Sequence, residues 1–152
     1  MAQYIDCYFL IDGRNSDLVK IFLKKYLPVN KESAEDYPIP LFSDHPVKIF
    51  DSVNDLLMYL ENNKDCKYSI YWHTDKKKSD IEHVMVFYTD DGKMIFGTSI
   101  SGNNPMEINN LKIFRDIRSF LNSEIGCMTV EEPPPFNSSE FVEFAKNRYS
   151  PD

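Results

Sequence analysis

The chain has 152 residues, of which 42% are apolar and 14% aromatic, a composition typical of one compact domain rather than two or a disordered chain. We therefore expect residues 1–152 to form a single domain. The formal net charge of −7 argues against a nucleic-acid-binding protein, because neutralising phosphates requires a basic surface. No stretch approaches the length of a membrane span, and no basic segment precedes the first apolar residues. We expect a cytoplasmic protein that does not contact a membrane.

The cysteines are odd in number and widely spaced, which argues against a disulfide framework or a zinc site. They are Cys7, Cys66 and Cys127. Each lies in or beside a predicted strand, so we interpret them as reduced thiols, most of them buried. The chain also lacks a phosphate-binding loop, and we expect neither a metal nor a cofactor.

The first predicted elements are a strand and a helix. Residues 4–11 have the apolar and aromatic character of a strand, and the turn residues Asp-Gly follow them. Ser16 is the expected N-cap of a helix that ends at Pro28, since proline cannot continue a helix. Residues 28–46 then contain four prolines among polar side chains, which predicts an ordered but irregular surface loop.

A second helix is predicted from Ser52 to about Asn62. Ser52 and Asp55 resemble a capping box, and leucines recur at helical spacing behind them. Between residues 31 and 65 the chain carries eight acidic residues but only three lysines, so much of the negative charge gathers in this segment. The acidic residues are Glu32, Glu35, Asp36, Asp44, Asp51, Asp55, Glu61 and Asp65.

Three alternating runs between residues 66 and 100 predict an antiparallel meander. Asp91-Gly92 is a strong signal for a two-residue hairpin turn, because both central positions of a type I′ turn need a positive φ. That turn would place Phe87 opposite Phe96. A slip of one residue would exchange the two faces of the strand.

This register divides the meander into two faces. The predicted core face consists of Tyr68, Ile70, Trp72, Met85, Phe87, Met94, Phe96 and Ile100. The opposite face carries Tyr71, His73, Glu82 and Tyr88, a mixture of phenols and charge that recurs at protein interfaces. Two interpretations stay open: this face binds a partner, or a second layer such as the C-terminal helix covers it.

The C-terminal third predicts a third helix over residues 109–123, stopped by Gly126, a short strand over residues 127–130, and a last helix capped by Ser138 or Ser139. Strict alternation of strands and helices is absent. The order of elements therefore predicts an α+β fold, with an antiparallel meander of at least four strands and about four helices in a single layer.

His73 and Glu82 form the best catalytic candidate, because as cross-strand neighbours the carboxylate could orient the imidazole. The pair lacks a positioned nucleophile, and such pairs are usually structural contacts. We therefore predict no catalytic residue. The histidines do not form a metal set either, since His73 and His83 are expected on opposite faces and His45 lies in the proline-rich loop.

Two segments carry a family resemblance. Residues 83–101, HVMVFYTDDGKMIFGTSIS, contain a strand, an Asp-Gly hairpin and a second strand, and residues 50–63, FDSVNDLLMYLENN, precede the strand YSIYWHT. This arrangement resembles immunity proteins of bacterial polymorphic and contact-dependent toxin systems. Family members often have leucine after the glycine, where this chain has Thr98. The resemblance implies a small, acidic, cytosolic α+β protein that neutralises one cognate toxin by binding it.

Under this hypothesis the partner is a protein such as a basic toxin, and the chain is not an enzyme. Glu35, Asp36 and Asp44 would steer that partner, while Tyr71 and Tyr88 would anchor the contact.

Two alternatives remain from the residues themselves. One is a small-molecule-binding protein or enzyme with a pocket near His73 and Glu82, and the other is a domain that self-associates through its sheet. The sequence leaves the oligomeric state open.

Overall fold

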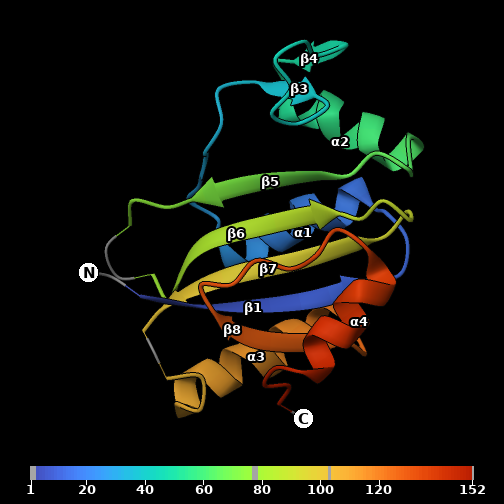
Figure 1. Ribbon diagram of the computed structural model, residues 1–152. Coiled ribbons are helices and arrows are strands. Elements are labelled where there is room, and N and C mark those ends of the chain that lie inside the picture. The colour runs from blue at the N-terminus through green and yellow to red at the C-terminus, as the bar shows by residue number, and fades with distance from the viewer. Residues whose placement is uncertain (1–2, 77–78, 103, 152) are drawn as a thin grey trace.

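The computed structural model describes residues 3–76, 79–102 and 104–151, and it has the predicted α+β class (Figure 1). Within these residues a six-stranded antiparallel sheet has the order β2-β5-β6-β7-β1-β8, and β3 and β4 form a separate two-stranded sheet. The elements are β1 (Tyr4–Ile11), α1 (Ser16–Tyr26), β2 (Lys31–Glu32), β3 (Tyr37–Ile39), β4 (Lys48–Phe50), α2 (Val53–Asn62), β5 (Tyr68–His73), β6 (Ile81–Tyr88), β7 (Met94–Ser101), α3 (Ile108–Leu121), β8 (Gly126–Val130) and α4 (Ser138–Lys146). No helix among the described residues is both long and apolar enough to cross a membrane.

The start of α1 differs by one residue from the prediction. Asn15, not Ser16, is the N-cap, and its side-chain oxygen accepts a hydrogen bond from the Leu18 N–H at 3.1 Å. The Ser16 hydroxyl instead donates to the Leu57 carbonyl at 3.1 Å and to the Glu61 carboxylate at 3.0 Å. Ser16 therefore joins α1 to α2.

The β6–β7 hairpin has a three-residue loop, not the predicted two-residue turn. Thr89 and Lys93 close the loop: the Thr89 N–H donates to the Lys93 carbonyl at 3.0 Å, and the Lys93 N–H donates to Thr89 Oγ1 at 2.8 Å. Only Gly92 of the loop has a positive φ, +87°, as in a type I turn followed by a left-handed residue. The register therefore moves by one residue, and Phe87 lies opposite Ile95 instead of Phe96.

This shift turns β6 over relative to the prediction. Val84, Val86 and Tyr88 face the main core, while Met85 and Phe87 face the other side of the sheet. The main core contains the buried side chains of α1, α2 and α3 against one face of the sheet.

The prediction of a single layer of helices was wrong, because α4 packs on the face of the sheet opposite to α1, α2 and α3 (Figure 1). Phe141 and Ala145 of α4 form a second cluster there with Tyr8, Met85 and Phe87, among others. This is the second layer that the sequence left open.

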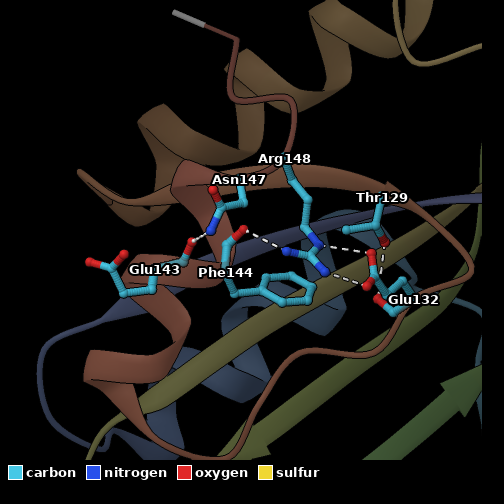
Figure 2. A network of polar contacts seen from close by, with 6 residues as sticks. All are labelled: Thr129, Glu132, Glu143, Phe144, Asn147 and Arg148. Atoms are coloured by element: carbon cyan, nitrogen blue, oxygen red, sulfur yellow. Dashed lines mark hydrogen bonds and ion pairs between the residues drawn. The ribbon is translucent and has the colours of Figure 1, made fainter.

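Contacts at both ends hold α4 on the sheet. At its start, the Asp91 carboxylate of the hairpin loop accepts hydrogen bonds from the backbone N–H and the hydroxyl of Ser138. At its end, the Arg148 guanidinium donates to both oxygens of Glu132, one at 2.7 Å, and stacks 3.7 Å from the Phe144 ring (Figure 2). This ion pair raises the pKa of Arg148 and lowers the pKa of Glu132.

The third helix also ends differently. Asn122, in the left-handed conformation at φ 51°, terminates α3, and Gly126 is instead the first residue of β8. A Cβ at Gly126 would lie 2.8 Å from a ring carbon of Phe9 in the neighbouring strand β1. Glycine at this position therefore permits close packing of the Phe9 ring.

The segment predicted as an irregular loop over residues 28–46 contains β2 and β3. Strand β2 adds an edge to the large sheet, and β3 pairs with β4 beside α2. Figure 1 shows β3, β4 and α2 together beyond β5, at the end of the sheet that β2 borders. We call β3, β4, their connecting loop and α2 the projecting unit.

Candidate functional site

A polar row crosses all six strands of the large sheet. Its members are successive register partners: Thr129, Asp6, Ser99, His83, His73 and Lys31. Because side chains two residues apart share a face, the row lies on the α4 side of the sheet, next to Tyr8 and Met85. It brings the titratable side chains of Asp6, His83, His73 and Lys31 into one line across the sheet.

Hydrogen bonds and ring contacts define the row. The Ser99 hydroxyl donates to Asp6 Oδ1 at 2.7 Å, and Tyr4 meets the His83 ring edge-on with 5.2 Å between centroids. The Ser33 hydroxyl lies 3.0 Å from His73 Nδ1. The serine that bonds to the carboxylate, Ser99, therefore differs from the serine beside the imidazole, Ser33, which is not the arrangement of a Ser-His-Asp triad.

Burial sets the electrostatics of the row. Desolvation raises the pKa of Asp6 above its ordinary value, although the Ser99 hydrogen bond acts in the opposite direction. Desolvation also lowers the pKa of His83, with a smaller opposing effect from Glu82. A lowered pKa keeps the His83 imidazole neutral near pH 7. Among the described residues, no group of three or more His, Cys, Asp or Glu side chains is placed to hold a metal ion.

The His73–Glu82 pair considered as a catalytic candidate is not formed. His73 lies opposite His83, and Glu82 sits where the pairing register shifts between Ile81 and His83. The β5–β6 pairing, like the β6–β7 pairing, is one residue away from the predicted register. Five surface hollows are lined by described residues, and neither His73 nor Glu82 lines any of these five.

The prediction that Tyr88 binds a partner is wrong, because its ring lies in the main core with 1% exposure. The Arg14 guanidinium stacks over this ring at 5.0 Å. Tyr71 points to the other face, is 41% exposed, and packs edge-on against Phe87 at 5.8 Å. The two tyrosines therefore lie on opposite faces and cannot form one patch.

The predicted acidic positions are on the surface. Glu35, Asp36 and Asp44 are exposed, the first two just before β3 and the third in the loop between β3 and β4. Glu32 is engaged within the chain, since it accepts a hydrogen bond from the Tyr37 hydroxyl. The structure thus places three free carboxylate side chains on or beside the projecting unit.

Sequence reasoning missed the exposed apolar residues of the same unit. Their exposed fractions are 91% for Phe42, 83% for Val47, 53% for Ile49 and 59% for Met58. For Phe42 the available signal was an apolar residue inside the proline-rich, polar segment of residues 28–46, whereas Met58 lies within the predicted second helix.

Neither a family model nor a curated protein matches the chain. Among solved structures, the chain is similar to one chain of a crystal structure of the toxic C-terminal tip of CdiA from Pseudomonas aeruginosa in complex with immune protein. The likeness covers 99% of both chains with a TM-score of 0.50 and 18% sequence identity. At this identity the likeness shows the fold. The fold resemblance that the sequence indicated over residues 50–101 is confirmed at that level.

Proposed function

We propose that this chain is a non-enzymatic immunity protein that binds and neutralises a protein toxin in the cytoplasm. The observation that carries the proposal is a likeness of fold along 99% of both chains to a member of a toxin–immune protein complex. The net charge of −7 supports the immune side of such a complex, because an acidic protein attracts a basic partner and would repel a nucleic-acid substrate.

The proposed contact includes the exposed carboxylates Glu35, Asp36 and Asp44. Charges on a protruding unit act early in a diffusional encounter, since they reach the partner before the rest of the surface does. Tyr71 is the aromatic candidate on the large sheet, with a phenol ring 41% exposed beside the polar row.

A growth assay tests the proposal. The toxic tips of CdiA-type proteins encoded in the same genome are each expressed from an inducible promoter, with and without this chain. We expect the chain to restore growth against one tip and to co-purify with it. Loss of growth caused by this chain alone would assign it to the toxin side, and protection against none of the tips would overturn the proposal.

The control for this assay is a charge-matched variant with reversals outside the projecting unit. Asp80, Glu107 and Glu124 are exposed and lie on other parts of the chain. We expect their combined replacement by lysine to leave protection intact. Lost protection in this control would mean that overall charge, and not a particular surface, decides neutralisation.

A further inference from the structure

The outer face of the β3–β4 sheet is apolar and has no covering element among the described residues. Tyr37 and Ile39 of β3 turn inward, with 2% and 5% exposure, and pack in the main core. Ile49 lies opposite Pro38 on the other face and is 53% exposed. Val47, two residues before it, is 83% exposed. A two-stranded sheet of this kind exposes side chains that a globular core would normally bury.

A groove runs between β4 and α2 beside this face. Its volume is about 660 Å³, and Ile49 and Met58 contribute exposed apolar side chains to its lining. Phe50 and Tyr59 also line it, with ring centroids 5.2 Å apart, and the Lys48 ammonium lies over both rings.

Carboxylates border this groove. Asp51 and Asp55 line it and are exposed, and Asp44 is exposed in the loop that joins the two strands. Lys48 is the lysine in the lining, and its charge faces the aromatic rings. The groove therefore combines apolar and aromatic side chains with polar residues and a negative rim.

The contacts of Phe42 reveal no role for this residue in stabilising the fold. Its ring is 91% exposed, and its backbone has a φ of +63°, a left-handed conformation that is unfavourable for a residue with a Cβ. An exposed ring gains no burial energy to offset that strain. Backbone strain of this kind clusters at functional surfaces, which makes Phe42 a candidate for a binding contact.

We propose that the apolar docking surface, defined as Phe42, Val47, Ile49 and Met58, binds a segment of the toxin that carries an aliphatic or aromatic side chain flanked by lysine or arginine. The apolar side chain would fill the groove between Ile49 and Met58, and the cations would pair with Asp51 and Asp55. This inference rests on the proposed function and specifies the surface and the chemistry of the partner.

Charge complementarity selects this occupant over two others. A second copy of the chain would bring identical carboxylates together, because a symmetric contact places the same patch on both sides. An anionic membrane would repel the same rim. A basic toxin segment is the occupant that satisfies both the apolar side chains and the negative charge.

The test measures affinity for the toxin tip that the wild-type chain neutralises, refolded after separation from its complex in guanidinium. We expect the double variant Ile49→Ser/Met58→Ser to raise Kd by about 100-fold, and Phe42→Asn by about tenfold, because anchors near the centre of an interface dominate affinity. Ile108→Ser is the matched control, since Ile108 is 84% exposed on α3, and its Kd should stay within about threefold of the wild type. Circular dichroism and urea midpoints verify that each variant is folded.

Each outcome decides the proposal. Unchanged Kd in the folded Ile49→Ser/Met58→Ser variant would overturn this docking surface and leave the proposed function standing. A wild-type chain that binds and neutralises no tip would remove the proposed function and this inference with it. If sedimentation shows a wild-type dimer that the double variant dissociates while toxin binding is unchanged, the occupant is a second copy and the proposal is wrong.

Discussion

The large sheet and the outer face of the projecting unit use their aromatic and aliphatic side chains in opposite ways. In the sheet, Trp72, Phe96 and Tyr88 are 2% exposed or less and pack against helices. In the projecting unit, Phe42 and Val47 are more than four-fifths exposed. Burial accounts for the first group, since removing apolar surface from water is the main stabilising contribution to folding. The second group contributes little to folding, which is why we assign it to binding.

One side chain joins the two regions. Arg14 donates four hydrogen bonds to backbone carbonyls: those of Leu60, Asn63 and Cys66 at the end of α2 and after it, and that of Thr89 in the hairpin loop. Their lengths lie between 2.5 and 2.9 Å. Arg14 thereby anchors α2, one side of the groove, to the sheet.

The largest expected effect comes from Arg14→Met. This change removes the Arg14 hydrogen bonds to the buried carbonyls of Leu60 and Thr89, although Thr89 keeps a 3.4 Å bond from the Gly92 N–H, and each such loss costs about 1–3 kcal/mol. We expect the free energy of unfolding, measured in urea, to fall by about 3–5 kcal/mol. Arg14→Lys should recover less than half, because one ammonium cannot reach all four carbonyls. Lys20→Met, at an exposed position of α1, is the control, and a loss no greater than in this control would contradict the anchoring role.

The next effect tests how tightly the second layer packs on the sheet. A Cβ at Gly97 would lie 2.9 Å from two ring carbons of Tyr8 and 3.2 Å from Met85 Cε. We expect Gly97→Ala to lower the free energy of unfolding by about 1–3 kcal/mol, the usual cost of overpacking. Tyr8→Leu should relieve the clash, so the double variant should lose less than the sum of the single changes. Additive losses would show that the α4 face is loosely packed.

Charge reversal should slow binding without affecting folding. Replacing Glu35, Asp36 and Asp44 by lysine should lower the association rate with the toxin about tenfold at low ionic strength, equivalent to about 1.4 kcal/mol, and flatten its salt dependence. The urea midpoint should stay near the wild-type value because all three side chains are exposed. Stopped-flow association over a range of salt concentrations measures this. The Asp80, Glu107 and Glu124 lysine variant is the charge-matched control, and an equal slowing there would remove the claim of local steering.

Phe42→Asn should stabilise the fold while it weakens binding. Asparagine tolerates the left-handed backbone, so the free energy of unfolding should rise by about 0.5–1 kcal/mol. Phe42→Ala separates the two effects, because alanine loses the ring but keeps the Cβ penalty, and its stability should match the wild type. If both variants are destabilised, the ring has a structural contact and the contrast between the two regions is weaker than we infer.

The smallest effect concerns the pH dependence of stability. Burial raises the pKa of Asp6, so the folded chain holds this proton more tightly than the unfolded chain. The resulting stabilisation is fully present below the unfolded pKa, about 3.9, and is lost as pH rises through the raised folded value. Asp6→Asn removes this dependence. The stability difference between wild type and variant, from urea unfolding between pH 3.5 and 7, should decline with rising pH, and a flat difference would contradict the raised pKa.

The elements were largely predictable from local signals. The strand over residues 4–11 matches β1. The ends of the helix predicted before Pro28 and of the helix predicted after Ser52 lie within about two residues of those of α1 and α2. Proline, glycine and apolar spacing act within a few residues, so these signals need no tertiary context. The exposure of Glu35, Asp36 and Asp44 was also predictable, because charges in a proline-rich loop have no reason to be buried.

The Tyr88 and His73–Glu82 predictions failed because β6 pairs one residue away from the predicted register on both of its sides, with β7 and with β5. A loop of Asp-Asp-Gly can close a hairpin with two or three residues, since Gly92 supplies the positive φ in either case. Because side chains alternate between the two faces of a strand, a one-residue error in the pairing of β6 exchanges its faces and moves Tyr88 from the core to the surface.

The sequence by itself determined the α+β class, the acidic surface and most element boundaries, because composition and short-range periodicity encode them. Only the tertiary structure decided the register, the second layer formed by α4 and the apolar surface on the projecting unit. Each of these depends on contacts between residues far apart in the chain, such as the stacking of Arg14 on Tyr88 and the bond from Ser138 to Asp91. The free energies of such long-range contacts decide between competing arrangements of the chain. A local sequence pattern carries no information about those contacts.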